Sequence, residues 1–257
     1  MSGPFGSNQF FGAAAATGYV PEGSMWFDSG DGTELNADSR TSDSSNKKRN
    51  IISVWRKGAY PQTTSGAQII GVGAPDYDRI EFYVVSPTVS LQYTFSGASP
   101  AYSIVSDAVL LDPTGWQHIV ISFDSTQDSG SRVSFYYNGV LIPGQWYHSG
   151  GEVPADFESE LLGNSITTDL CGGGGGAGNI NCYISEFIAV DGKSIQNGDV
   201  AITAFGTENS EGLWVPIKPT VSGYGNNGFY LDFADSSSSG TLLGNDVSGN
   251  DNDFDTT

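Results

Sequence analysis

Short apolar runs, each bounded by turn-forming residues, constrain the fold of this chain more than any other feature. From about Met25 onward they read SMWFDS, NIISVWRKG, AQIIGVG, DRIEFYVV, VSLQYTFSG, HIVISFD, RVSFYYNG and CYISEFIAVDG. Gly, Pro, Asn, Asp and Ser separate them, and no long window shows apolar residues at helical spacing. The pattern predicts an all-β fold, an antiparallel β-sandwich of the jelly-roll type.

The stretch GWQHIVISFDSTQDSGSRVSFYYNGVLI, residues 115–142, is the most regular part of this pattern. In HIVISFD both alternating sets of side chains are partly apolar, which indicates a central strand. Asn138-Gly139 predicts a tight hairpin turn, because both residues tolerate positive φ. His118 and Asp124 stand at the two ends of the first strand, and ~3.4 Å per residue puts them about 20 Å apart. That distance is too long for a proton relay.

Acidic residues strongly outnumber basic ones. The chain has 29 Asp and Glu against 10 Lys and Arg, a net charge of −19. Such a field repels phosphate backbones and anionic membranes, so we expect neither nucleic acid nor membrane as a partner. No apolar run approaches the ~20 residues that span a bilayer. The start, MSGPFGSNQFFGAAAATGYV, lacks the basic and apolar segments of a signal peptide, so we expect synthesis in a cytoplasm.

We expect one folded domain, residues 25–235, between an extended N-terminal arm and a C-terminal tail. Residues 1–24 are rich in Gly, Ala and Ser and are interpreted as a docking arm, because isolated aromatic side chains on a tether can be buried only against something else. A disordered tail is the alternative. Residues 236–257 are interpreted as an acidic tail rich in Asn, Ser and Gly. The candidate docking residues of the arm are Phe5, Phe10, Phe11 and Tyr19.

The spacing of carboxylates argues against catalysis. Retaining glycosidases hold two carboxyl groups ~5–5.5 Å apart, which an E-x-D-x-E run on a strand would supply. The nearest candidate is Glu158 with Glu160 in ADFESELLGN, which lacks the middle carboxylate. We interpret the two as solvated and assign no catalytic residue. A polysaccharide-degrading enzyme on the same fold is the alternative.

The segment GQWYHSGG is the best candidate for a ligand surface. A sugar stacks its C–H face on an aromatic ring while its hydroxyls need polar partners. Trp146, Tyr147 and His148 supply such groups in an expected loop, and we predict a carbohydrate-binding surface there. The alternative is that Trp146 covers a sheet edge.

Cys171 and Cys182 flank the glycine-rich GGGGGAGNIN. Two cysteines in a cytoplasmically made protein are more often free thiols than a bridge. A disulfide across the loop is the alternative, and zinc is disfavoured because no further Cys or paired His completes a ligand set.

The order of these segments resembles that of the concanavalin A-like, laminin-G-like jelly-roll domains in virion proteins of tailed bacteriophages. The resembling runs are SRTSDS, SVWRKG, the stretch 115–142, YISEFIAVDGKSI, FGTENSEGLWVPIKP, YGNNGFYLDFADSS and LLGNDVSGNDNDF. The resemblance implies a non-enzymatic component of the virion surface: a tail fibre, a receptor-binding appendage or a capsid decoration. The implied partners are other virion proteins and host-surface glycans, and we expect a homo-oligomer.

Laminin-G and pentraxin relatives bind calcium through loop carboxylates, so the resemblance also makes calcium a candidate ligand. The richest clusters do not follow the twelve-residue calcium-loop spacing, and solvated turns are favoured. We therefore assign no cofactor or metal. The clusters are Asp28, Asp31 and Glu34, and Asp246, Asp251, Asp253 and Asp255.

Overall fold

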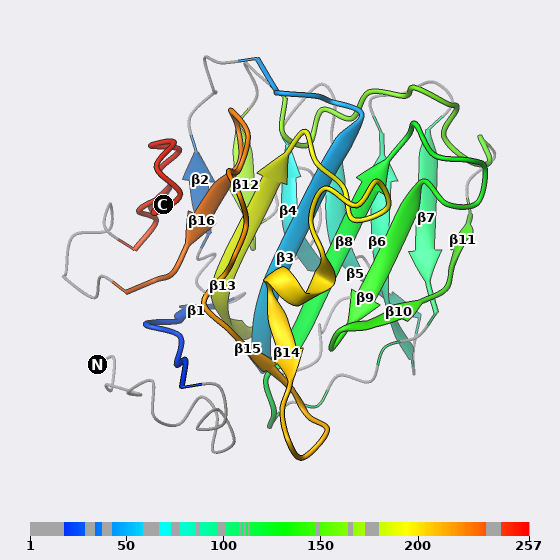
Figure 1. Ribbon diagram of the computed structural model, residues 1–257. Coiled ribbons are helices and arrows are strands. Elements are labelled where there is room, and N and C mark those ends of the chain that lie inside the picture. Colours follow the sequence, from blue (N-terminus) through cyan, green and yellow to red (C-terminus); the bar gives the residue numbers. More distant parts are fainter. Residues whose placement is uncertain are drawn as a thin grey trace.

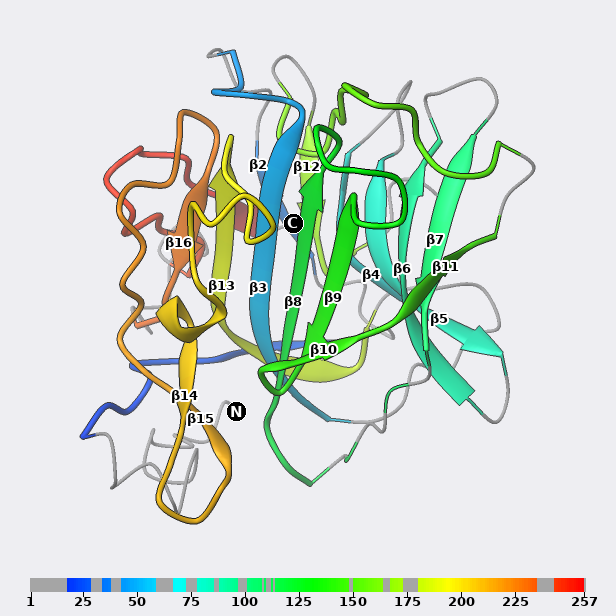
Figure 2. The same cartoon turned by 45° about the vertical axis from the view of Figure 1, so that its right-hand side comes forward.

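Two antiparallel sheets pack face to face in the computed structural model (Figures 1 and 2), which confirms the predicted β-sandwich. Among the described residues, no helix is long and apolar enough to cross a membrane. The structure describes residues 18–28, 34–37, 43–58, 67–72, 78–85, 88–96, 101–107, 109, 112, 114–147, 150–163, 167–172, 180–234 and 243–256.

The first sheet, sheet A, has the strand order β1-β13-β3-β8-β9-β10, and β16 also pairs with β13. Strand β8 lies between β3 and β9 and all its residues are buried, which confirms the prediction of a central strand. The strands are β1 (Met25–Phe27), β3 (Arg49–Gly58), β8 (Gln117–Asp124), β9 (Val133–Tyr137), β10 (Val140–Ile142), β13 (Cys182–Asp191) and β16 (Phe229–Leu231).

The second sheet, sheet B, has the order β11-β7-β6-β5-β4-β12-β2-β17. Because Pro143 alone separates β10 from β11, the chain crosses there from the edge of sheet A to the edge of sheet B. The opposite edges are β1 and β17. The strands are β2 (Leu35–Ala37), β4 (Ala67–Val72), β5 (Arg79–Val85), β6 (Thr88–Phe95), β7 (Tyr102–Ser106), β11 (Gly144–Trp146), β12 (Thr168–Leu170) and β17 (Asp255–Thr256).

The chain buries apolar side chains on both faces of sheet A. The main core lies between the sheets and includes alternate residues of β8, from Ile119 to Phe123. A smaller core lies on the outer face, where Val120 and Ile188 meet Phe205. It is covered by the segment with the short helix η3 (Ile202–Ala204) and the hairpin of β14 (Gly206–Glu208) and β15 (Trp214–Pro216), drawn in yellow and orange in Figure 1. This cover explains why β8 reads as apolar on both sides.

The hairpin turn between β9 and β10 is the one expected from Asn138-Gly139. The two residues have φ of 47° and 77°, so both occupy the left-handed region that such a turn requires. A Cβ on Gly139 would lie 2.5 Å from the ring of Trp214. Glycine is therefore needed here both for its conformation and for the close approach of the β14–β15 hairpin.

The described parts of both expected terminal segments, residues 18–24 and 243–256, pack on the sandwich, and the boundaries at residues 24 and 235 stay a prediction. Near the N-terminus, Ser185 Oγ donates to Gly23 O at 2.6 Å. Near the C-terminus, Phe254 is 1% exposed and its ring lies 4.7 Å from that of Phe229, centroid to centroid. Strand β17 then pairs with β2. The described residues 243–256, rich in Asn and Asp, form turns that lead into this strand.

Candidate functional site

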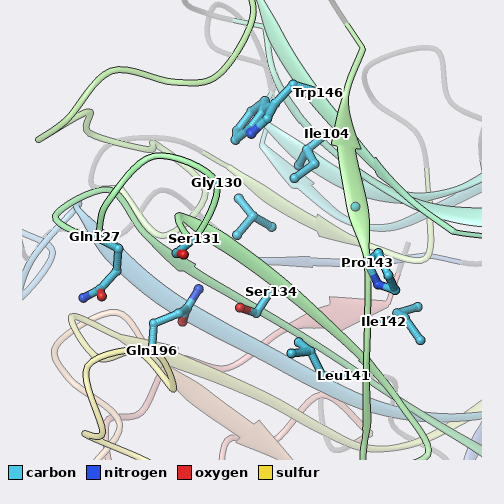
Figure 3. Close-up of a pocket in the computed structure, with 12 residues that line it drawn as sticks. Ile104, Gln127, Gly130, Ser131, Ser134, Leu141, Ile142, Pro143, Trp146 and Gln196 are labelled. Atoms are coloured by element: carbon cyan, nitrogen blue, oxygen red, sulfur yellow. The ribbon is translucent and has the colours of Figure 1, made fainter.

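The crossover from β10 to β11 forms one wall of a groove of about 510 Å³ (Figure 3). Strand β10 pairs with β9 only from Phe135 to Tyr137, because the chain leaves sheet A after Ile142. The first residues of β9, Val133 and Ser134, therefore lie at an uncovered edge and line the groove. The groove thus follows from the early departure of the chain toward sheet B.

The two sides of the groove differ in chemistry. Hydroxyl and amide side chains from sheet A and its loops lie on one side, whereas apolar residues of the crossover lie on the other, with Trp146 and Ile104 at one end (Figure 3). The polar residues are Gln127, Ser131, Ser134 and Gln196, and the apolar ones of the crossover are Leu141, Ile142 and Pro143.

The loop that carries Gln127 and Ser131 is held by charged side chains behind it. Arg132 Nε donates to Gln127 O at 3.1 Å. The carboxylate of Glu152 accepts from Gly130 N at 2.8 Å and from Ser129 Oγ at 2.5 Å. These bonds hold three residues of the loop, Gln127, Ser129 and Gly130, against charged side chains. The polar side of the groove is therefore preorganised.

Gln196, on the loop after β13, is also held by hydrogen bonds, in this case to Ser122 of β8. Its Nε2 donates to Ser122 O at 2.8 Å, and its Oε1 accepts from Ser122 Oγ at 2.5 Å. The amide therefore has one orientation, set by β8.

Trp146 and Tyr147, two of the residues predicted to form a carbohydrate-binding surface, lie in different surroundings. Trp146 lines the groove, half-buried, with its ring 6.4 Å from that of Phe95, centroid to centroid. Tyr147 is 66% exposed, does not line the groove and lies 6.3 Å from Tyr83, between ring centroids. The two point to opposite sides because side chains alternate along β11. His148 lies outside the described residues.

Of the four aromatic residues assigned to the docking arm, the structure describes Tyr19. Its hydroxyl donates to Glu186 Oε1 at 3.0 Å, and the hydroxyl of Tyr230 donates to Oε2 at 2.5 Å. Tyr19 therefore binds this chain's own sandwich. Phe5, Phe10 and Phe11 lie outside the described residues.

Glu186 occupies an irregular point of β13. Strand β1 pairs with β13 up to Ile184 and β16 pairs from Phe187, so Glu186 lies where these two edge strands meet. The register against β3 shifts between Ser185 and Ile188, a β-bulge, and Glu186 has a φ of 48°. A non-glycine residue in this region is under backbone strain. Its bonds to Tyr19 and Tyr230 hold it there.

Glu186 is 2% exposed. Burial raises its pKa from 4.5 to about 7, against the hydrogen bonds from the two tyrosines, which lower it. The nearby carboxylates of Asp232 and Glu22 raise it further. The run YISEF did contain a signal for this site, namely a single acid inside an apolar strand.

His118 is a packing residue and has no part in the groove. Its ring stacks between those of Trp55, at 4.6 Å, and Trp214, at 6.1 Å, between centroids. Trp214 Nε1 lies 2.9 Å from His118 Nδ1, and an indole N–H can only donate. Nδ1 is thus the unprotonated nitrogen, and Nε2 donates to Ser53 Oγ at 2.8 Å.

Burial lowers the pKa of His118 to about 3, so the ring is neutral. At the other end of β8, Asp124 accepts hydrogen bonds from Ser194 Oγ at 2.6 Å and Thr126 N at 3.0 Å. Asp124 thus anchors loops to sheet A, whereas His118 anchors the β14–β15 hairpin to it.

Acidic residues considered for catalysis or calcium binding either pair with a lysine, accept hydrogen bonds from their own loop or face solvent. Glu160 Oε2 pairs with Lys47 Nζ at 2.6 Å, and Glu158 is exposed. Asp246 accepts bonds from its own loop, including Ser248 N at 2.9 Å and Asn252 N at 3.0 Å. In the described part of the chain, no three His, Cys, Asp or Glu residues gather to hold a metal ion. Asp31 lies outside that part.

Cys171 and Cys182 are both buried free thiols. Burial raises the pKa of each. Neither lines the groove.

The fold and the groove define a lectin-like β-sandwich domain. The sequence model of the concanavalin A-like lectin/glucanases superfamily matches residues 27–172, more than half of the chain, and the chain belongs to this family. A search of curated proteins finds no match.

Three solved structures superpose in part on this chain. A candidate carbohydrate-binding protein from Bacteroides ovatus superposes with a TM-score of 0.52 at 14% identity, over 91% of this chain and 57% of that one. Domains LG4–5 of the mouse laminin α1 chain give 0.46 at 14% identity, over 84% and 48%. The pentraxin of Limulus polyphemus gives 0.43 at 14% identity, over 61% and 69%. This chain spans little more than half of the Bacteroides protein, and at these identities the likeness concerns the fold alone.

Proposed function

We propose that this protein is a non-enzymatic carbohydrate-binding domain whose ligand lies in the groove beside Trp146. The observation that carries the proposal is the pairing of an aromatic ring with hydroxyl and amide side chains along one groove. A sugar ring needs both, because its C–H face is apolar and its hydroxyls require partners. The groove volume, about 510 Å³, falls within the ~300–1,000 Å³ of small-molecule sites.

The lining also supports binding without catalysis. Glycoside hydrolysis requires a carboxylic acid and a second carboxylate beside the scissile bond. Among the lining residues that the structure describes, none carries a carboxyl group. The alternative, a polysaccharide-degrading enzyme, therefore has no support from this site.

A pair of neighbouring aromatic residues on and after β11 allows a matched test. Trp146→Ala removes the ring that lines the groove, whereas Tyr147→Ala removes an exposed ring outside it. We expect loss of glycan binding on an array or by calorimetry for Trp146→Ala and wild-type binding for Tyr147→Ala. Equal binding by both variants would refute the placement of the site. Release of new reducing ends from the bound glycan would refute the non-enzymatic assignment.

We further propose that the domain acts on the surface of a tailed-bacteriophage particle, as part of a tail fibre, an appendage or a capsid decoration. This rests on the order of sequence motifs given above. In this proposal Phe5, Phe10 and Phe11 dock the chain to other virion proteins, and the particle presents several copies. Deleting residues 1–17 keeps the contact of Tyr19 with Glu186 and should abolish incorporation into particles. Retention of the truncated protein in purified virions would contradict the docking role.

A further inference from the structure

The described lining of the groove carries no charge although the protein is highly acidic. The lining residues that the structure describes are all uncharged, in a chain with a net charge of −19. A carboxylated or sulfated sugar would enter the groove without a cation to pair with, and burying an unpaired charge is costly. The net charge would repel it as well.

Asp128, next to Gln127, is exposed and adds to the repulsion of an anionic sugar, whereas Arg132 and Asp124, the next charged residues along this loop, are already engaged. Arg132 donates to Gln127 O and to Val153 O, at 3.1 and 2.8 Å, and pairs with Glu152 at 3.6 Å. Asp124 accepts from Gln127 Nε2 at 3.1 Å and pairs with Arg49 at 3.2 Å. These side chains hold the loop in place, so they are not available to a charged ligand.

The apolar side of the groove favours a sugar that carries an apolar substituent. Leu141 lines it and is 59% exposed, followed by Ile142 and Pro143. A hydroxyl placed there would lose its bonds to water without replacement, whereas a methyl group would be favourably buried. Gln127 and Ser131, on the polar side, suit an amide. A sugar with an acetamido group offers both a methyl and an amide.

We infer that the groove selects an uncharged oligosaccharide of acetamido sugars. This rests on the proposed function and adds the ligand class to it. Burial of one methyl group contributes a factor of about four in affinity. The class follows from three features together: the uncharged described lining, the engagement of the neighbouring cation Arg132, and the apolar strip Leu141–Pro143.

The test compares three trisaccharides with one β-1,4-linked backbone. Chitotriose carries acetamido groups, cellotriose carries hydroxyls in their place, and sulfated chitotriose adds charge. We expect calorimetry on the full chain to give chitotriose an affinity at least about fourfold above that of cellotriose, and roughly tenfold or more above that of the sulfated form. Leu141→Ser should reduce the preference over cellotriose toward one.

Val140→Ser is the matched control, because Val140 is 64% exposed on the same strand but does not line the groove. It should keep the wild-type preference. Equal or tighter binding of cellotriose or the sulfated sugar, lost in Trp146→Ala, overturns the inference and leaves the proposed function standing. Absence of binding to any glycan overturns the proposed function itself. Self-association that Leu141→Ser abolishes in the absence of sugar would assign the face to a second copy and overturn both.

Discussion

Glu186 gives the sharpest prediction about stability. The perturbation is Glu186→Gln, which keeps the shape of the side chain and removes its titration. Burial raises the pKa of Glu186 to about 7. Between pH 4.5 and 7 the folded protein therefore holds a proton that the unfolded chain has released. The free energy of unfolding then falls as pH rises through this window.

The magnitude follows from the two pKa values. At about 1.36 kcal/mol per pH unit, the interval from 4.5 to about 7 amounts to about 3 kcal/mol. This stability is fully present below pH 4.5 and is lost as pH rises through 7. Glu186→Gln retains an amide that can bond to both Tyr19 and Tyr230, so its unfolding free energy should not share this loss.

Urea denaturation between pH 4.5 and 8 measures the effect. All other titrating groups are common to both proteins, so the difference between wild type and Glu186→Gln isolates this one site. We expect Glu186→Gln to gain about 3 kcal/mol relative to wild type across the window. Glu158→Gln, at an exposed glutamate, is the control and should follow wild type. A constant difference between wild type and Glu186→Gln across the window would refute the reasoning.

Three further predictions concern packing. Trp214→Phe leaves His118 Nδ1 buried without its donor, so urea denaturation should show a loss of about 1–3 kcal/mol; an unchanged midpoint would contradict the hydrogen bond. Phe254→Ala opens a cavity beside Phe229 and should lower the unfolding free energy by about 3–5 kcal/mol, whereas a loose tail would give no change. Cys171 and Cys182 are buried with raised pKa values, so a thiol reagent should modify them only after denaturant is added; rapid reaction of the folded protein would argue against their burial.

Features that depend on residues close together in the chain could be predicted from the sequence. The alternation in β8 indicated a central strand, because both of its faces are covered. The turn at Asn138-Gly139 followed from the backbone freedom of those two residues. The wide separation of His118 and Asp124 followed from strand geometry alone, since they lie near opposite ends of β8.

The groove could not be predicted, because separate segments contribute to it. Gln127 and Gln196 lie in loops after different strands and meet only because β8 and β9 bring those loops together. Trp146 and Tyr147 were predicted together from their chemistry, and only the structure shows that Trp146 lines the groove and Tyr147 does not. The contact of Tyr19 with Glu186 joins residues far apart in the sequence, and composition alone made the N-terminal segment resemble a free arm.

The arrangement of the sheet edges determines where the described terminal strands lie relative to the groove. The groove lies on the side of β10 and β11, whereas β1, the first strand of the chain, and β17, the last, form the opposite edges of the two sheets (Figure 1). The described strands nearest the two termini thus lie on the side of the domain away from the groove. A support attached at those strands would leave the groove of each copy accessible to an opposing surface.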